Sequence, residues 1–231
     1  MTTRNLFLSV LVLLATVGAV AQTQSHDIKV DDFDNLEVLD KVNVVYVQSD
    51  KMAGHITFKA TKAIAKEFLL NSNNGKLKIE TRTDAEKADD YPTLTIYSST
   101  LSHVYNDSEC NVTIDSIHTD GDLKVRVMGN GSITLKRAVA QNLTLNIITG
   151  KGTITCNGNC ENLTATVVGK GRVNAENLVA TNATCRLTGV GEIKINVHGG
   201  EIKAKGSGGG KIIYKGTPSK VANYKNLIPA E

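Results

Sequence analysis

A Gly-x-Gly step that recurs about every 20 residues constrains the fold of this 231-residue chain more than any other feature. The first glycines of the five steps are separated by 21, 19, 20 and 19 residues. The steps are Gly129-Asn130-Gly131, Gly150-Lys151-Gly152, Gly169-Lys170-Gly171, Gly189-Val190-Gly191 and Gly208-Gly209-Gly210. The fourth residue after each first glycine is β-branched: Ile133, Ile154, Val173, Ile193 and Ile212. Self-similarity at this period indicates stacked coils, each of which buries its apolar face against its neighbours.

Apolar residues alternate with polar ones in the stretch before each glycine step, as in strands with one buried face. Two residues before the first glycine stand Val127, Ile148, Val167 and Leu187, and Gly206 interrupts this column. Four residues before it stand Val125, Ala165, Cys185 and Ala204, and six before it Leu123, Leu163, Ala183 and Ile202. The coil that ends at Gly150 has one extra residue, so Leu143 falls seven back, which predicts a β-bulge. A sixth, degenerate copy precedes the five, with Ser108-Glu109-Cys110 in the glycine place.

We expect the two outer glycines of each step to mark one corner of every coil, because glycine permits positive φ and close backbone approach. Asn142, Asn162 and Asn182, spaced 20 residues apart, each begin an Asn-x-Thr triplet and mark a second point of the coil. Each can hydrogen-bond its equivalent in the next coil. The triplets are glycosylation acceptors only in a host that modifies them. Their even spacing favours the structural role.

The pattern predicts an all-β fold: a right-handed β-helix or β-solenoid-like stack of ~20-residue coils with an N-terminal β-rich cap. We expect the cap to span residues 22–100, the coils residues 101–218 and a C-terminal tail residues 219–231. Strands are expected at Asp31–Val47, His55–Ala60, Lys76–Thr83 and Thr93–Tyr97, and a charged loop at Asp84–Asp90. The only predicted helix is Thr61–Leu70, with Thr61 as N-cap. The cap and the tail would cover the two ends of the stack.

The first 21 residues fit a secretory signal peptide. Arg4 precedes the apolar run Leu6–Gly18, and Ala19-Val20-Ala21 fits a cleavage site. The apolar run is shorter than the ~20 residues of a membrane-spanning helix. Cleavage after Ala21 would leave 210 of the 231 residues, starting at Gln22, and no transmembrane segment. We therefore expect an exported protein, located in the periplasm, at the cell surface or in the medium.

The charge balance argues against two classes of partner, and the four cysteines raise the separate question of disulfides. Without Arg4 the chain has 25 basic and 23 acidic side chains, a balance that does not favour nucleic acid or an anionic membrane. Basic residues do lie on the outside of several coils, as a solvated face or as a mild preference for acidic polymers: Lys124, Arg126, Lys151, Lys170, Arg172, Lys194, Lys203, Lys205 and Lys211. Export permits disulfides among Cys110, Cys156, Cys160 and Cys185, whose pairing the sequence leaves open. Structural roles are favoured for all four.

No motif predicts a catalytic, cofactor or metal site. A calcium β-roll needs Asp after the second glycine, where this chain has Ser132, Thr153, Arg172, Glu192 and Lys211. A polysaccharide lyase or hydrolase would need clustered acids. The candidates are Asp107, Glu109, Asp115, Asp120, Asp122, Glu161, Glu176, Glu192 and Glu201. Only Asp120 and Asp122 are predictably close, and they are expected in a solvated turn.

The recurring Gly-x-Gly-x-Ile/Val element, with the lead-in Pro92-Thr93-Leu94-Thr95-Ile96, resembles the family called "putative auto-transporter adhesin, head GIN domain" of exported Bacteroidetes proteins. The resemblance covers about residues 28–218, including Tyr214-Lys215-Gly216-Thr217-Pro218. It implies an all-β, β-helix-like fold and a role in adhesion. It carries over no catalytic or binding residue.

These observations predict an exported, non-enzymatic β-solenoid that serves as an adhesin or binding scaffold for an extended glycan or a cell-surface protein. The coils expose long, regularly spaced rows of polar side chains suited to such ligands. Two alternatives remain open: a carbohydrate-active enzyme built on a β-helix, and a structural protein that assembles end to end into a homo-oligomer.

Overall fold

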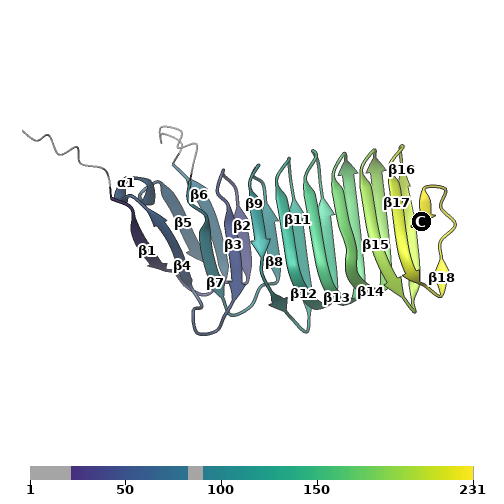
Figure 1. Ribbon diagram of the computed structural model, residues 1–231, viewed down its shortest axis with the longest axis horizontal. Helices are drawn as coiled ribbons and strands as arrows, with labels where there is room; N and C mark the ends of the chain where they lie inside the picture. Colours follow the sequence, from purple (N-terminus) through teal and green to yellow (C-terminus); the bar gives the residue numbers. More distant parts are fainter. Residues whose placement is uncertain (1–21, 83–90, 231) are drawn as a thin grey trace, which may run out of the picture.

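The computed structural model describes residues 22–82 and 91–230. Strands lie across the long axis of an elongated stack, from β1 (Gln24–Lys29) at one end to the C-terminal strands at the other (Figure 1). The predicted all-β solenoid of ~20-residue coils is confirmed. The expected signal peptide, residues 1–21, and the expected loop Asp84–Asp90 lie outside the described residues.

One coil contributes three segments to the stack, as β12 (Ser132–Ile147) shows. Its segments pair in parallel with three strands that precede it in the chain: β9 (Asn111–Ile114), β10 (Ile117–His118) and β11 (Asp122–Val127). We name the rows of strands that contain β9, β10 and β11 face A, face B and face C. A Gly-x-Gly step joins face C of one coil to face A of the next.

The later coils repeat this path in register. β13 (Thr153–Gly169) and β14 (Arg172–Gly189) each supply all three faces. The pairing of β12 with β13 shifts by one residue between Leu135 and Ala138, at the corner between faces A and B. The remaining strands complete the stack: β15 (Glu192–His198) on faces A and B, β16 (Glu201–Ser207) on face C, β17 (Lys211–Thr217) on faces A and B, and the short closing strands β18 (Lys220–Val221) and β19 (Leu227–Pro229).

The N-terminal coils do not stack in chain order. On face C, β2 (Asn35–Val38) pairs with both β6 (Lys76–Thr81) and β8 (His103–Asn106). On face A, β3 (Val44–Gln48) pairs with both β7 (Leu94–Ser98) and β9. The coil that comes first in the sequence therefore lies between two coils that come later. The repeat pattern does not predict this insertion.

Antiparallel strands form the N-terminal end of the stack. β4 (His55–Ala60) pairs with β7, and β1 pairs with β4, so face A gains two strands. On face C, β5 (Phe68–Asn73) forms a hairpin with β6 through Asn74 and Gly75, whose φ angles are 51° and 74°. Positive φ at both central residues is the geometry that Asn-Gly favours in two-residue hairpins.

The predicted helix Thr61–Leu70 is too long. The helix α1 covers only Lys62–Ala65, and Thr61 caps it as expected, because its side chain accepts a hydrogen bond from the N–H of Ile64. Phe68 and Leu70 belong instead to β5. Local propensity favoured a longer helix, but pairing with β6 and burial of Phe68 outweigh it.

The residue that places Leu143 seven before Gly150 lies in the turn after Ile147, and not in a β-bulge between Leu143 and the turn. The register shift that β12 does have lies before Leu143, between Leu135 and Ala138. Val127 pairs with Ile147 and Ile147 with Val167, which places Ile147 in the buried column. Ile148, expected there, is 37% exposed, whereas Ile147 is fully buried. Counting back from the glycine assumed a turn of constant length, and this turn is one residue longer.

Inward side chains of all faces form one apolar cluster that extends from Phe33 to Ile212. The cap and the coils therefore share a single core. The strands alternate buried and outward residues along most of their length, so the outward residues form columns along the stack.

Candidate binding face

The first glycines of the five steps form a column along one corner of the stack. Each has a positive φ, between 84° and 117°, a conformation that residues with a side chain rarely adopt. A Cβ built on Gly150 would lie 2.1 Å from the carbonyl oxygen of Gly129 in the neighbouring coil. Alanine therefore fits neither the backbone conformation nor the available space.

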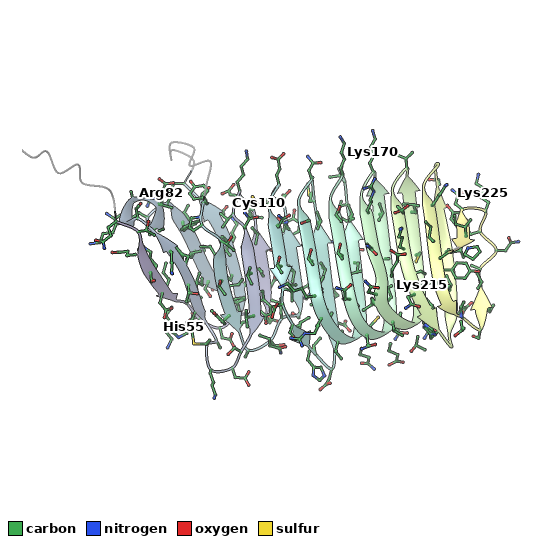
Figure 2. All side chains as sticks on the ribbon, viewed as in Figure 1. His55, Arg82, Cys110, Lys170, Lys215 and Lys225 are labelled. Carbon is green, nitrogen blue, oxygen red and sulfur yellow. The ribbon has the colours of Figure 1, made fainter. Side chains whose placement is uncertain are left out.

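The second glycines are buried, and at four of the five an added Cβ would collide with a core side chain. A Cβ built on Gly171 would lie 2.6 Å from Cγ2 of Ile147, a core side chain of the preceding coil. Gly152, Gly191 and Gly210 meet core side chains in the same way. The residue between the two glycines points out: Lys170 projects from the edge of the stack (Figure 2). The steps thus shape the corner, and only their middle residue presents a side chain to solvent.

Asn142, Asn162 and Asn182 form a ladder of side-chain hydrogen bonds at the start of face C. Nδ2 of Asn162 donates to Oδ1 of Asn142 at 3.0 Å, and Nδ2 of Asn182 donates to Oδ1 of Asn162 at 3.1 Å. Nδ2 of Asn142 donates to Oδ1 of Asp122 at 2.9 Å, and Oδ1 of Asn182 accepts from the N–H of Glu201 at 3.0 Å. The amides are thereby engaged in joining successive coils.

The degenerate coil has Ser108-Glu109-Cys110 in place of a Gly-x-Gly step, and the side-chain amide of a buried asparagine stabilises its corner. Asn106 occupies the position of Val127 and is fully buried. Its Nδ2 donates to the carbonyl oxygens of Cys110 and Ser132 at 3.0 Å each, and its Oδ1 accepts from the N–H and hydroxyl of Ser108. Sequence reasoning missed Asn106. The only signal was a polar residue in an otherwise apolar column.

Face C carries two outward columns of side chains that cross eight strands. The first column holds, in order along the stack, Lys76, Asn35, His103, Lys124, Thr144, Thr164, Thr184 and Lys203. The second holds Lys78, Glu37, Tyr105, Arg126, Asn146, Thr166, Arg186 and Lys205. Paired strands lie ~4.8 Å apart, so each column spans about 34 Å. This face can contact a long ligand at many regularly spaced points.

A groove of about 430 Å³ opens on face C where β2, β8, β11 and β12 meet, and Tyr105 forms part of its wall. The Tyr105 hydroxyl donates to Oδ2 of Asp107 at 3.0 Å and lies 3.2 Å from Sδ of Met128. Burial raises the pKa of Tyr105, and the hydrogen bond to Asp107 raises it further. The ring is therefore neutral and held in place as an apolar surface inside a polar groove.

The groove has excess positive charge. Lys124 and Arg126 line it and are exposed, and neither makes an ion pair within the described residues. Glu37 also lines it, but its Oε1 lies 2.6 Å from Nζ of Lys76. The acid is thus already neutralised, and the two cations remain available.

An apolar strip borders these columns. Met128, Ile148 and Val168 lie just beyond the second column, at the end of face C next to the glycine steps, and are between 37 and 41% exposed. Methyl and thioether groups here can contact the apolar side of a ligand whose polar groups meet the columns. Face C therefore combines charge, hydroxyls, amides and an apolar border.

The acids considered for catalysis are scattered, and most already have partners. Asp115 pairs with Lys136 at 2.9 Å, and Glu201 pairs with Lys220 at 3.0 Å. Asp122 ends the asparagine ladder, while Asp120 lies 3.6 Å from Nε2 of His118. Within residues 22–82 and 91–230, no group of three or more His, Cys, Asp or Glu side chains could hold a metal ion.

The four cysteines are free thiols. Cys156, Cys160 and Cys185 are buried, and Cys110 is half-buried. Burial raises the pKa of all four, to about 12 for Cys160 and Cys185. Neutral buried thiols pack as small apolar groups, and their high pKa values disfavour a nucleophilic role.

Solved structures share this fold at low sequence identity. A "putative adhesin" from Bacteroides fragilis matches with a TM-score of 0.73 and 20% identity over 90% of this chain and 93% of that one. A "putative adhesin" from Parabacteroides merdae has a TM-score of 0.71 and 19% identity over 92% and 98% of the two chains. A "putative lipid binding protein" from Parabacteroides distasonis has a TM-score of 0.66 and 17% identity over the same shares.

A search of the curated proteins finds no match to the chain. In the part of the chain that the structure describes, no helix is long and apolar enough to cross a membrane. One family model matches residues 32–218, which is most of the sequence and includes every glycine step. The chain therefore belongs to the family described as "Putative auto-transporter adhesin, head GIN domain".

Proposed function

We propose that this protein is an exported, non-enzymatic binding protein of the adhesin type, and that face C holds an extended ligand, a glycan or a segment of a surface protein. The observation that carries the proposal is the register of face C, where two polar columns cross eight strands without interruption. A rigid row of equivalent groups loses little conformational entropy on binding. The family and the adhesins of similar fold support the same class of role.

The test uses residues 22–231, purified and labelled, on arrays of glycans and of extracellular proteins. Each ligand that binds is then incubated with the protein at high concentration, and its products are analysed for released sugar. Binding without turnover is the expected result. Release of reducing or unsaturated sugar would instead support the carbohydrate-active enzyme.

Assembly of copies end to end is a second candidate, which one observation favours. β1 pairs only with β4 within the described residues, so one edge of this six-residue strand has no partner strand there. An open edge can pair with a strand of another chain. Light scattering over a hundredfold range of concentration distinguishes the two, since growth of the particles with concentration would favour assembly.

A further inference from the structure

We infer that face C binds an extended acidic glycan, with one anionic group at Lys124 and Arg126 and another about three to four coils away at Arg186 and Lys205. This inference rests on the proposed function and specifies its ligand class. It comes from the charge of the two columns, the neutral groups between their charged parts, and the contrast with face A.

The charge of the two columns is strongly one-sided. Seven positions hold Lys or Arg, and a single position holds an acid, Glu37. That acid pairs with Lys76, and Lys78 pairs with Glu80 at 2.8 Å. Lys203 lies 3.5 Å from Glu201 on the same strand. The cations of the columns that make no ion pair within the described residues are Lys124, Arg126, Arg186 and Lys205. The chain as a whole is nearly balanced, with 26 basic and 23 acidic residues. The two columns therefore carry a larger excess of positive charge than the composition of the chain predicts.

Face A also carries cations, but acidic side chains lie beside them. Arg172, Glu192 and Lys211 follow one another in a single outward column, so the acid lies between the two cations. Lys194 pairs with Glu176 at 3.5 Å. On face C, Lys124, Arg126 and Arg186 have no acid beside them in the columns, and this part of the face therefore attracts an anion.

The uncharged part of face C separates its positive charges. Arg126 and Arg186 stand three strand spacings apart in one column, about 14 Å, and Asn146 and Thr166 lie between them. Lys124 and Lys203 stand four spacings apart, about 19 Å, and three threonines separate them. Hydroxyl and amide groups hydrogen-bond to hydroxyls. The order of charges and hydroxyls therefore matches a polymer in which acidic groups are spaced by neutral, hydroxylated units.

The ring of Tyr105 and the apolar strip distinguish a glycan from other anions. A sugar ring has an apolar side that the Tyr105 ring or the strip of Met128, Ile148 and Val168 can cover. Single-stranded nucleic acid would need several stacking aromatic rings and closely spaced cations. The two columns contain only two ring side chains, His103 and Tyr105, and both lie on β8.

The test compares two double variants of residues 22–231. K124Q/R126Q removes two charges from face C, and the control K151Q/K170Q removes two from the exposed middle positions of the glycine steps. Probes are oligogalacturonate, its methyl ester, hyaluronan and chondroitin sulfate, measured by calorimetry at several salt concentrations. Circular dichroism and thermal unfolding verify that both variants fold.

The expected result is binding of at least one of the three acidic probes, and weaker binding of the methyl ester than of oligogalacturonate. K124Q/R126Q should weaken acidic binding by about tenfold or more, because hydrogen bonds between charged groups are worth that order. The control should retain affinity within about twofold, and adding R186Q/K205Q to K124Q/R126Q should weaken binding again. The salt dependence should be lower in the face C variants.

Equal losses in the face C and control variants would overturn the inference, because affinity would then follow net charge alone. Equal binding of the methyl ester, or tighter binding of single-stranded DNA or anionic vesicles than of every acidic glycan, would do the same. Binding of neutral glycans or proteins, with none of the acidic probes bound, would overturn the inference but leave the proposed function standing. Failure of every array ligand to bind would remove the support for both.

Discussion

Nδ2 of Asn162 donates to Oδ1 of Asn142 at 3.0 Å, across the 20 residues that separate two successive coils. The bond is one of a chain of four that begins at Asp122 and ends at the N–H of Glu201. Both residues are half-buried. The ladder therefore fixes the register of neighbouring coils by a polar contact, at a point where the repeat carries no apolar side chain.

Removing a central member of this ladder should destabilise the stack. Asn162→Ala deprives both Asn142 and Asn182 of a partner, and the loss of two hydrogen bonds should lower the free energy of unfolding by about 1–3 kcal/mol. Urea unfolding measures the change. Asn159→Ala is the matched control, since Asn159 is an exposed residue of the same strand and should change stability by less than about 0.5 kcal/mol. Equal effects would show that the ladder contributes nothing.

The first glycine of a step should tolerate no side chain. Gly150→Ala imposes a strained φ of 85° and a Cβ 2.1 Å from a backbone oxygen, and should cost roughly 2–4 kcal/mol. Gly209→Ala provides the comparison, because its φ is not positive and its nearest neighbour, Cγ1 of Val190, would lie 3.9 Å away. Thermal unfolding should show a clear decrease for Gly150→Ala and almost none for Gly209→Ala. A stable Gly150→Ala protein would contradict the stacking of these corners.

Two adjacent isoleucines test the register of the coil that has the longer turn. Ile147→Ala removes a fully buried side chain and should lower the free energy of unfolding by about 2–5 kcal/mol. Ile148→Ala changes a side chain that is 37% exposed and should cost less than about 1 kcal/mol. Urea unfolding of both variants under the same conditions measures the two changes in the free energy of unfolding. The reverse order of effects would restore the register inferred by counting back from Gly150.

Buried thiols should make the protein less stable at alkaline pH. Burial raises the pKa of Cys185 from 9.0 to about 12, so the folded state keeps a proton that the unfolded state loses. The stabilisation is complete below pH 9 and is lost as the pH rises from 9 towards 12, with a slope of up to about 1.4 kcal/mol per pH unit for each thiol. Cys185→Ala should therefore flatten the dependence of unfolding free energy on pH between 9 and 11. An unchanged slope would indicate that the thiol does not titrate on unfolding.

Sequence patterns were sufficient for the parts of the fold that repeat. The glycine period predicts the coils because each step must satisfy the same corner geometry, and His55–Ala60 was predicted with the bounds that β4 has. Thr61 as an N-cap depends only on neighbouring residues, and it was correct. Features that follow from local chemistry or from repetition are thus accessible without a structure.

Other features depend on partners distant in the sequence. The residues from Phe68 to Leu70 continue the helical pattern that begins at Thr61, and they become a strand only because β6 lies beside them. Asn106 gives no sign that its amide will bond Ser132, 26 residues later. Face C could not be assembled from the sequence either, because Glu37 and Tyr105 become neighbours only when β2 is inserted next to β8.

That insertion has a consequence for the order in which the chain acquires structure. β2 and β3 each lie between two strands that come later in the sequence, and the last of these partners, β9, ends at Ile114. A chain that emerges N-terminus first can pair its first coil on one side with β6 and β7, but the other side has no partner until about half of the chain has been released. The glycine coils can then add one turn at a time in chain order, whereas the first coil is complete only when strands from two later stretches of the sequence flank it.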